Sequence, residues 1–295
     1  MNVILSYNRL WQAPEPPSTN DGRSALSWRL TESENAYNAW YRCTSIKGVE
    51  DGVLSGQRVA VKDNIAVGGV EMMNGSRALE GFVPREDATL VTRILAQGGE
   101  LAGKATCEEL CVSGVSWNTA LGPVRNPWNR DYSAGGSSSG CAALVALGEV
   151  ESAVGGDQGG SIRIPAASCG IVGLKPTWGL VPYTGVVPCH FSVDHVGPMA
   201  ATVTRCAQLL QAIAGFDDNR DMRQPSIGMP QIDYLAEKPL DPSLRLGILT
   251  EAFVGCEEEV VEVVQRAIGL IAAAITTSHL SIPEHAFSHI LTSIC

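Results

Sequence analysis

The sequence lacks the features that would assign it to a specialised structural class. Charged residues make up 18% of its 295 positions and aromatic residues 6%, while 45% are hydrophobic. That is the composition of an ordinary folded domain, not of a disordered or fibrous chain. No apolar run approaches the roughly 18 residues needed to cross a bilayer. The run from Met1 to Pro17 has no basic start followed by a long apolar core, so we expect no secretory signal.

Positive charge is also scarce. The chain has 21 lysines and arginines against 31 aspartates and glutamates, which gives a net charge of −10. Proteins that bind nucleic acid or anionic membranes usually present an excess of basic residues. We therefore expect neither nucleic acid nor a membrane as a partner, and the acidic surface is compatible with a homodimer.

The nine cysteines form no CxxC motif, and the nearest pair, Cys107 and Cys111, has three residues between its members. This spacing does not match a zinc site, which stays the minor alternative. Several cysteines lie in apolar runs, as Cys141 does. We interpret them mostly as reduced, buried residues of a cytoplasmic protein, and we expect no metal and no organic cofactor.

Short apolar segments alternate with segments of helical spacing along the chain. Buried strands are predicted at 59–61, 100–103, 153–154 and 244–249, and helices at 33–41, 88–97, 139–147, 203–215 and 257–275. This alternation predicts a layered α/β domain.

Two loops rich in glycine and serine stand out, at 134–140 and 155–163. The run Gly159-Gly160-Ser161 can turn successive N–H groups toward one point, as an oxyanion hole requires. Flexible turns and phosphate binding are the alternatives, but neither loop contains a phosphate-binding GxxxxGK[ST] or GxGxxG pattern.

The segment 136–140 also satisfies GxSxG, the pattern of the nucleophile elbow in α/β-hydrolases. That fold needs an acidic residue and then a histidine further along, for which Asp194-His195, His285 and His289 are available. This alternative leaves the second loop and Lys62 without a role.

Four ordered motifs resemble the amidase-signature family, over residues from about 54 to 215. They are Val61-Lys62-Asp63-Asn64, the loop 135–140, the run 157–166 and Gly173-Leu174-Lys175-Pro176-Thr177. The runs 156–160, 181–185 and 194–198 most resemble microbial amidases that act on small or aromatic amides. The resemblance implies a mixed β-sheet core flanked by helices, with residues 1–50 as an N-terminal loop and helical segment and 51–295 as the amidase-signature core.

The family uses a Ser–Ser–Lys triad. Carried onto this sequence, the nucleophile is Ser161, the bridging serine is Ser137 and the base is Lys62. The family pattern also implies a cis peptide bond before Ser137. The expected substrate is a small-molecule amide, which is cleaved through an acyl-enzyme to an acid and ammonia or an amine. The oxyanion is then held by backbone N–H groups of Gln158, Gly159 and Gly160, together with that of the nucleophile.

The chemistry expected of Lys62 is physically coherent. Lysine is a poor base at neutral pH unless burial disfavours its charged form. Lys62 follows a short apolar run, which predicts a place at the end of a buried strand. Two other lysines, Lys104 and Lys175, are interpreted as structural. We expect Arg163 to pair with a carboxylate, and Asp157 to brace the second loop.

Family members are usually longer, and the residues after 274 do not align with their later elements. We therefore expect a fold that is incomplete on its C-terminal side. One alternative is an inactive remnant that acts as a binding or assembly partner. Another is the glutaminase-type subunit of an aminoacyl-tRNA amidotransferase, although the segment 103–110 differs from the Met-Asp-Glu-Phe of those subunits.

Overall fold

The computed structural model describes residues 23–217, 220–225, 229–237, 241, 243–272 and 275–281. The chain divides into two compact units, residues 1–235 and 236–295. The expected boundary after residue 50 stays a prediction. The structure places residues 40–47 in the same sheet as strands that follow that boundary.

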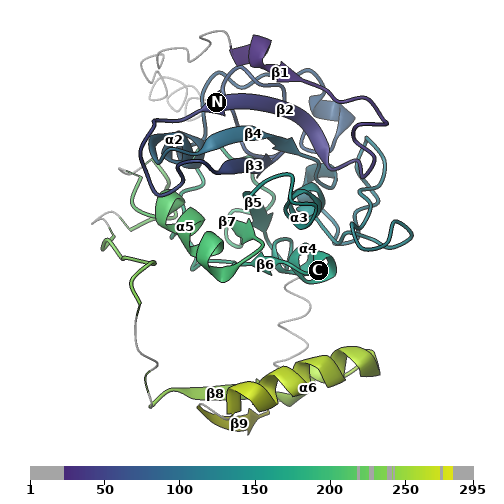
Figure 1. The fold of residues 1–295 in the computed structure, drawn as a ribbon, viewed down its shortest axis with the longest axis vertical. Helices are drawn as coiled ribbons and strands as arrows, with labels where there is room; N and C mark the ends of the chain where they lie inside the picture. The colour runs from purple at the N-terminus through teal and green to yellow at the C-terminus, as the bar shows by residue number, and fades with distance from the viewer. Residues whose placement is uncertain are drawn as a thin grey trace, which may run out of the picture. The chain divides into compact units, whose positions relative to one another are not determined.

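The first unit is built on a seven-stranded sheet (Figure 1). The spatial order is β1 (Ser27–Trp28), β2 (Trp40–Lys47), β4 (Glu100–Ala105), β3 (Arg58–Lys62), β5 (Ser152–Asp157), β7 (His195–Ala200) and β6 (Val172–Gly173). The three central strands β4, β3 and β5 are parallel, and the outer pairings are antiparallel. The expected mixed sheet is thereby confirmed.

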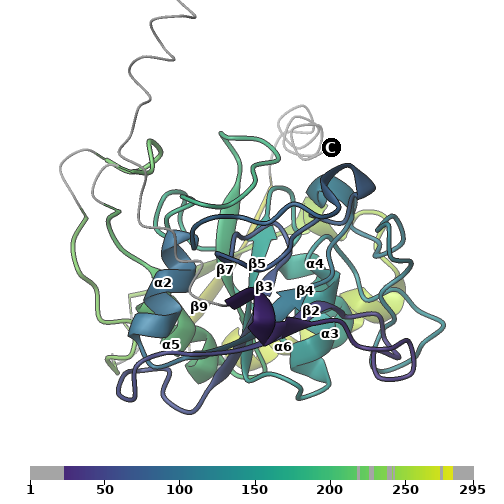
Figure 2. The ribbon, with the colours of Figure 1, turned by 90° about the horizontal axis from the view of Figure 1, so that it is seen from above.

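Helices cover both faces of this sheet, so that the unit has three layers (Figure 2). One face carries α2 (Thr89–Ala96) and α5 (Val203–Ile213), and the other carries α3 (Ser139–Ala146) and α4 (Arg163–Cys169). Short 3₁₀ turns lie at η1 (Arg23–Leu26), η2 (Arg77–Leu79) and η3 (Glu109–Cys111). None of the helices in the described ranges is long and apolar enough to span a bilayer.

The side chains of β3 show how the sheet divides the core. Val59 and Val61 belong to the hydrophobic cluster beneath α2 and α5, whereas Ala60 belongs to the cluster beneath α3 and α4. Successive side chains of a strand point to opposite faces. The next residue, Lys62, therefore points to the α3–α4 side.

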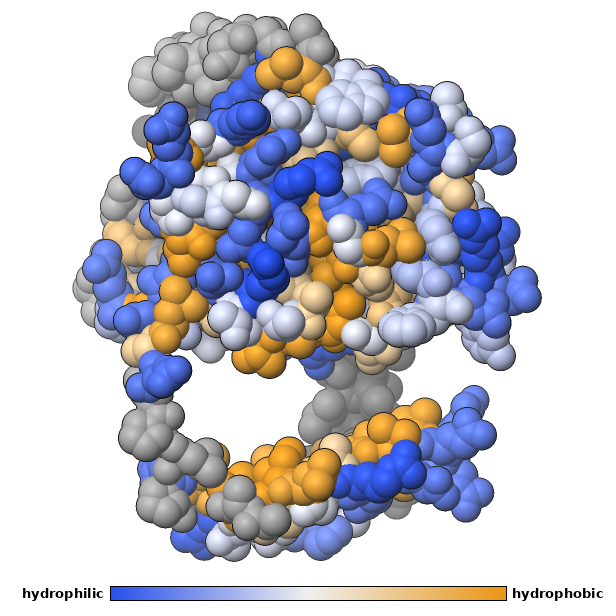
Figure 3. All heavy atoms as spheres, viewed as in Figure 1, coloured by the Kyte–Doolittle hydropathy of each residue, from blue (hydrophilic) through white to orange (hydrophobic). Residues whose placement is uncertain are grey.

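The second unit contains two parallel strands, β8 (Arg245–Leu249) and β9 (Thr276–Leu280), together with η4 (Thr250–Phe253) and α6 (Glu258–Ala272). Two glutamates in the first turn of α6 suit the positive end of the helix dipole. No residue of α6 is buried, and Val260, Val263 and Leu270 are more than half exposed, at 51%, 56% and 80%. Hydrophobic side chains accordingly gather on the surface of this unit (Figure 3).

The helix expected at 33–41 is wrong. Residues 32–37 form turns, and β2 begins at Trp40. The side chain of Asn35 binds both the carbonyl and the N–H of Trp40, at 2.8 and 3.1 Å, and Asn38 has a φ of 56°. These local bonds replace helical ones. The other predicted helices and strands are present within a few residues, except that β5 runs on to Asp157 and positions 273 and 274 lie outside the described residues.

Candidate active site

Three segments bring the predicted triad to one side of the sheet. Lys62 is the last residue of β3. Ser137 lies two residues before α3, and Ser161 lies two residues before α4. Since α3 and α4 cover the face to which Lys62 points, all three residues lie on the same side of the sheet.

Lys62 and Ser137 form a direct contact. The Nζ of Lys62 donates a hydrogen bond to the Oγ of Ser137 at 2.7 Å, and both residues are fully buried. The Gly136–Ser137 peptide bond is cis, as the sequence motif predicts. A Cβ at Gly156 of the neighbouring strand would lie 3.6 Å from the Nζ of Lys62, an ordinary van der Waals contact, so the lysine packs directly against this strand.

Ser161 is joined to this pair through the backbone. Its carbonyl accepts a hydrogen bond from the N–H of Ser138 at 3.2 Å, and the residue is 8% exposed. In the described part of the chain, no hydrogen bond links the hydroxyls of Ser137 and Ser161. The structure therefore brings the two serine segments together but leaves the contact between the two hydroxyls open.

Asp157 braces the second loop, as expected. Its carboxylate binds Arg163 through two hydrogen bonds of 3.0 Å and accepts the N–H groups of Gly160 and Ile162 at 2.8 and 3.2 Å. Burial alone would raise the pKa of Asp157, but the hydrogen bonds and charge of Arg163, with the two backbone donors, lower it.

The hydrogen bonds of Asp157 reduce the number of backbone N–H groups that are free to bind an oxyanion. The N–H of Gly160 is already used by Asp157. The N–H groups of Gln158, Gly159 and Ser161 form no hydrogen bond to any other described residue. They are the donors that remain available to a developing negative charge on a substrate oxygen.

The other two lysines lie elsewhere. Lys104 is aligned with Val61 in the sheet, so it points away from the α3–α4 side. It donates to the carbonyl of Ile65 and lies 3.3 Å from the carboxylate of Asp63. The Nζ of Lys175 contacts the Nε2 of His195 at 3.1 Å. The contacts of Lys104 and Lys175 are thus with the backbone, Asp63 and His195, in line with the structural roles expected for these lysines.

The GxSxG alternative fails on geometry. The central serine of the pattern, Ser138, is fully buried, and its hydroxyl bonds the carbonyl and N–H of Gly156 at 3.0 Å each. His195 bonds Lys175 and the carbonyl of Val193, so no serine–histidine pair forms there. The other candidates, His285 and His289, lie outside the described residues.

Sequence reasoning missed a carboxylate at the site. Glu108 is fully buried, and its N–H donates to the carbonyl of Ser137 at 3.2 Å. Burial raises the pKa of this carboxyl group against hydrogen bonds from Ser113 and Asn118. The only sequence signal was its place in the segment 103–110, which differs from the corresponding segment of the amidotransferases.

Several buried polar side-chain atoms have no well-formed hydrogen-bond partner in the described part of the chain. Among them are the amide of Gln158 and the hydroxyl of Tyr183, which are neighbours. The guanidinium of Arg223 stacks on the ring of Tyr183 at 4.2 Å from its centroid. Burial, with the negative charges of Asp194 and Cys111, raises the pKa of Tyr183. Unpartnered buried polar groups are rare and mark sites where a ligand or water can bind.

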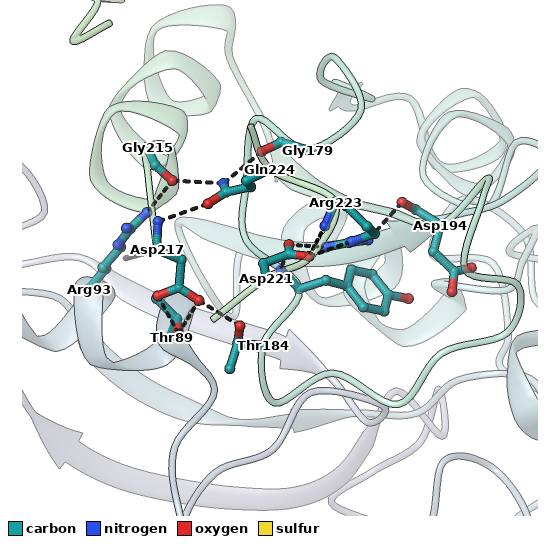
Figure 4. A network of polar contacts seen from close by, with 11 residues as sticks. Thr89, Arg93, Gly179, Thr184, Asp194, Gly215, Asp217, Asp221, Arg223 and Gln224 are labelled. Atoms are coloured by element: carbon teal, nitrogen blue, oxygen red, sulfur yellow. Dashed lines mark hydrogen bonds and ion pairs between the residues drawn. The ribbon is translucent and has the colours of Figure 1, made fainter. Parts of the chain in front are cut away.

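A polar network that includes Asp217, Asp221 and Arg223 (Figure 4) holds the backbone at Tyr183. The carboxylate of Asp221 accepts the N–H of Tyr183 at 2.8 Å and pairs with Arg223. Nearby, Asp217 accepts the hydroxyls of Thr89 and Thr184. The chain after α5 is thereby tied both to α2 and to the loop that carries Tyr183.

A mixed sheet between two helix layers, with a buried lysine bonded to a serine and a second serine at the start of the next helix, defines a three-layer α/β protein with a lysine–serine site. The chain belongs to the amidase family, whose model matches residues 23–294.

Individual relatives agree with this assignment. The chain is 48% identical to an enantioselective amidase of Rhodococcus rhodochrous, over 92% of this chain and 52% of that protein. It resembles the structure of a glutamyl-tRNA(Gln) amidotransferase subunit from Thermotoga maritima, with a TM-score of 0.79 and 33% identity over 86% of this chain and 56% of that one. It also resembles a peptide amidase from Stenotrophomonas maltophilia, with a TM-score of 0.70 and 36% identity over 81% and 50% of the two chains. The chain thus spans about half the length of the curated relatives it matches.

Proposed function

We propose that this protein hydrolyses the carboxamide of a small molecule, with Ser161 as nucleophile, Ser137 as proton relay and Lys62 as base. The observation that carries the proposal is the 2.7 Å hydrogen bond between the fully buried Lys62 and Ser137. A lysine is rarely buried in this way unless its environment gives it a role or a partner.

Lys62 is fully buried, and no carboxylate in the described part of the chain forms an ion pair with it. Neutral Lys62 takes a proton from Ser137 while Ser137 takes one from Ser161, and the Oγ of Ser161 attacks the amide carbon. The same relay returns the proton to the leaving nitrogen, and water then cleaves the acyl-enzyme.

Backbone donors stabilise the tetrahedral intermediate. The N–H groups of Gln158, Gly159 and Ser161 supply hydrogen bonds to the oxyanion, because Asp157 keeps the N–H of Gly160 for itself. One lost donor of this kind costs about 10²–10³ in rate in a serine hydrolase. Asp157 acts by fixing the loop, not by touching the substrate.

The substrate is proposed to be a small amide with a second polar group or its own amide nitrogen near Tyr183. The unpartnered amide of Gln158 and hydroxyl of Tyr183 offer both a donor and an acceptor there. The names of two relatives, an enantioselective amidase and a peptide amidase, support amide hydrolysis. We further propose a cytoplasmic protein and a homodimer, in line with its acidic composition.

A second candidate is a glutaminase-type component of an amidotransferase. It is favoured by the likeness to the amidotransferase structure from Thermotoga maritima. Hydrolysis of free glutamine, with no hydrolysis of benzamide, would favour this candidate over the first. An inactive remnant would hydrolyse neither compound and would not be acylated.

Labelling with a fluorophosphonate tests the proposal. Intact mass is expected to show one adduct on the wild-type chain and none on Ser161→Ala. Lys62→Met is expected to label about 10²–10⁴ times more slowly, because the general base is lost. Matched controls are Ser168→Ala, an exposed serine of α4, and Lys175→Met, and both are expected to label like the wild type. A folded wild-type chain that takes no adduct contradicts the proposal.

A further inference from the structure

Two cysteines form a cluster next to Lys62 that the hydrolytic mechanism does not use. Cys107 follows β4 and is fully buried, and Cys111 ends the 3₁₀ turn η3 and is 5% exposed. Both thiols donate to the same acceptor, the Oδ1 of Asn74, at 3.5 and 3.3 Å. They also contact each other, and Cys111 contacts Lys62. The two sulfur atoms thus converge on one oxygen atom.

The surroundings make the two thiols unequal. The contact with Cys107 and the neighbouring amine of Lys62 lower the pKa of Cys111, against the effect of burial. The same thiol–thiol contact, together with burial, raises the pKa of Cys107. Thiolates are the reactive form of cysteine, so Cys111 is the nucleophile of the pair and Cys107 its neighbouring thiol.

The backbone holds this arrangement in place. Leu110 and Cys111 have φ values of 50° and 64°, a left-handed conformation that non-glycine residues seldom adopt. The N–H of Leu110 is bound to the carbonyl of Asn74 at 2.9 Å, so the turn is tied to the residue that accepts both thiols. Asn74 in turn is fixed by the carboxylate of Asp63, which accepts its N–H at 2.8 Å.

We propose that Cys107 and Cys111 form a dithiol modification site, at which a hydroperoxide oxidises Cys111 and Cys107 then closes an intrachain disulfide. The observation behind it is the convergence of both sulfur atoms on Asn74 beside the amine of Lys62. The ligand class is a small two-electron oxidant or another thiophile that takes two neighbouring thiols.

The chemistry is balanced. The sulfur of Cys111 attacks one oxygen of the peroxide, the O–O bond breaks, and the products are a sulfenic acid and hydroxide. The sulfur of Cys107 then attacks the sulfenic sulfur, and the S–O bond breaks with loss of water. Each sulfur gives up one electron, and the peroxide takes up both. In sum, two thiols and one hydrogen peroxide give one disulfide and two water molecules.

The other cysteines of the described part of the chain lack this environment. Burial raises the pKa of Cys141 to about 12, of Cys169 to about 12 and of Cys206 to about 11. The thiols of these three cysteines donate to backbone carbonyls. Such thiols are poor nucleophiles and serve as internal controls.

Mass spectrometry of the full chain tests the site. The reduced protein is treated with a small excess of hydrogen peroxide, and the intact chain is expected to lose the mass of two hydrogen atoms. Peptide mapping after alkylation is expected to place the new bond between Cys107 and Cys111, and a thiol reductant is expected to reverse it. The mass readout requires no turnover, so its outcome is independent of the hydrolase activity proposed above.

Variants separate the roles of the two thiols. Cys107→Ser is expected to leave Cys111 as a sulfenic acid that dimedone traps, and Cys111→Ser is expected to abolish both products. Cys141→Ser, a change at a buried cysteine, is expected to behave like the wild type. Should a variant fail to fold, phenylarsine oxide on the wild type gives a second test, because it bridges neighbouring thiols with loss of water. The proposal is overturned if peroxide or the arsenical modifies the exposed Cys189 and Cys256 and leaves Cys107 and Cys111 as free thiols.

Discussion

Asp157 illustrates how one side chain shapes a loop of the candidate site. It is wholly buried, yet its partner Arg163 keeps 52% of its side chain exposed to solvent. The ion pair is thus half solvated, and the two backbone N–H bonds are the buried part of the interaction. Asp157 is therefore expected to contribute moderately to the free energy of unfolding. Its larger effect is expected on the conformation of the loop 155–163.

The lowered pKa of Asp157 predicts a pH dependence. A carboxyl group with a lower pKa in the folded than in the unfolded state adds stability above its unfolded value, and this contribution is lost as the pH falls through the folded value. Asp157→Asn is expected to lower the free energy of unfolding by about 1–3 kcal/mol near neutral pH. Urea unfolding is measured for both proteins from about pH 6 to about pH 3. The difference in unfolding free energy between the wild type and Asp157→Asn should shrink as the pH falls below 3.8, the ordinary pKa of an aspartate. A difference that grows in acid would contradict the assignment.

At the residue scale, the motif resemblance predicted the features that short sequence motifs specify. It did not predict contacts between residues that only the tertiary fold brings together. The Lys62–Ser137 contact and the cis bond follow the motifs. Composition alone gives no way to prefer Lys62 over Lys104, since both end up fully buried, and only the sheet register assigns them to opposite faces. Cys111 lies in η3 and Lys62 ends β3, so the two residues are far apart in the sequence. No local sequence pattern therefore signals their contact.

At the scale of elements, α3 is defined by how closely it approaches the sheet. Its sequence is composed of small and apolar residues, and Gly140 lies against the backbone of neighbouring segments. A Cβ there would lie 2.4 Å from the carbonyl oxygen of Ala39 and 2.6 Å from that of Thr106. Both obstacles are backbone atoms, so neither can move aside without distortion of β2 or of the segment after β4.

This approach predicts that Gly140→Ala destabilises the protein even though alanine favours helices. The expected loss is about 3 kcal/mol, the upper range for overpacking a core, and it is measured by urea unfolding. Gly269→Ala is the matched control, because Gly269 is also helical but has no atom within 4 Å of its Cβ position. It is expected to stabilise α6 by about 1 kcal/mol, seen as a stronger helical circular dichroism signal. Equal effects of the two substitutions would show that α3 is not closely packed.

Periodic elements were predicted well and irregular ones were not. The helices α2 and α5 follow clear apolar spacing, and α3 and β3 are continuous runs of small and apolar residues. The strand β7 contains Pro198, which normally argues against an inner strand. It forms because Pro198 pairs with Val154 of β5 and its carbonyl accepts the N–H of Leu174 at 3.0 Å. The short helix α4 was missed because Pro165 lies inside it, in the first turn where proline is tolerated.

At the scale of the whole molecule, the two units differ in how much apolar surface they bury. Both hydrophobic clusters lie entirely in the first unit. In the second unit, α6 buries no residue although its sequence is amphipathic. Helices in proteins draw most of their stability from packing of an apolar face. The second unit is therefore expected to be the less stable of the two.

Hydrogen exchange of the full chain measures this difference. Amides of β3 and β5 are expected to exchange slowest, because these strands are buried and paired on both sides. Amides of α6 are expected to exchange faster by several orders of magnitude, since local opening there exposes little new surface. Protection of α6 equal to that of β5 would mean that its apolar face is covered in solution, and this outcome would contradict the expectation.

The alternation along β3 has a consequence for how the site tolerates genetic change. A substitution scan would record Val59, Ala60 and Val61 as ordinary core positions. Deletion of any one of them would turn Lys62 to the α2–α5 side and bring Asp63 to the place of the base. The chemistry of the site is therefore encoded in the number of residues before Lys62 as much as in the lysine itself.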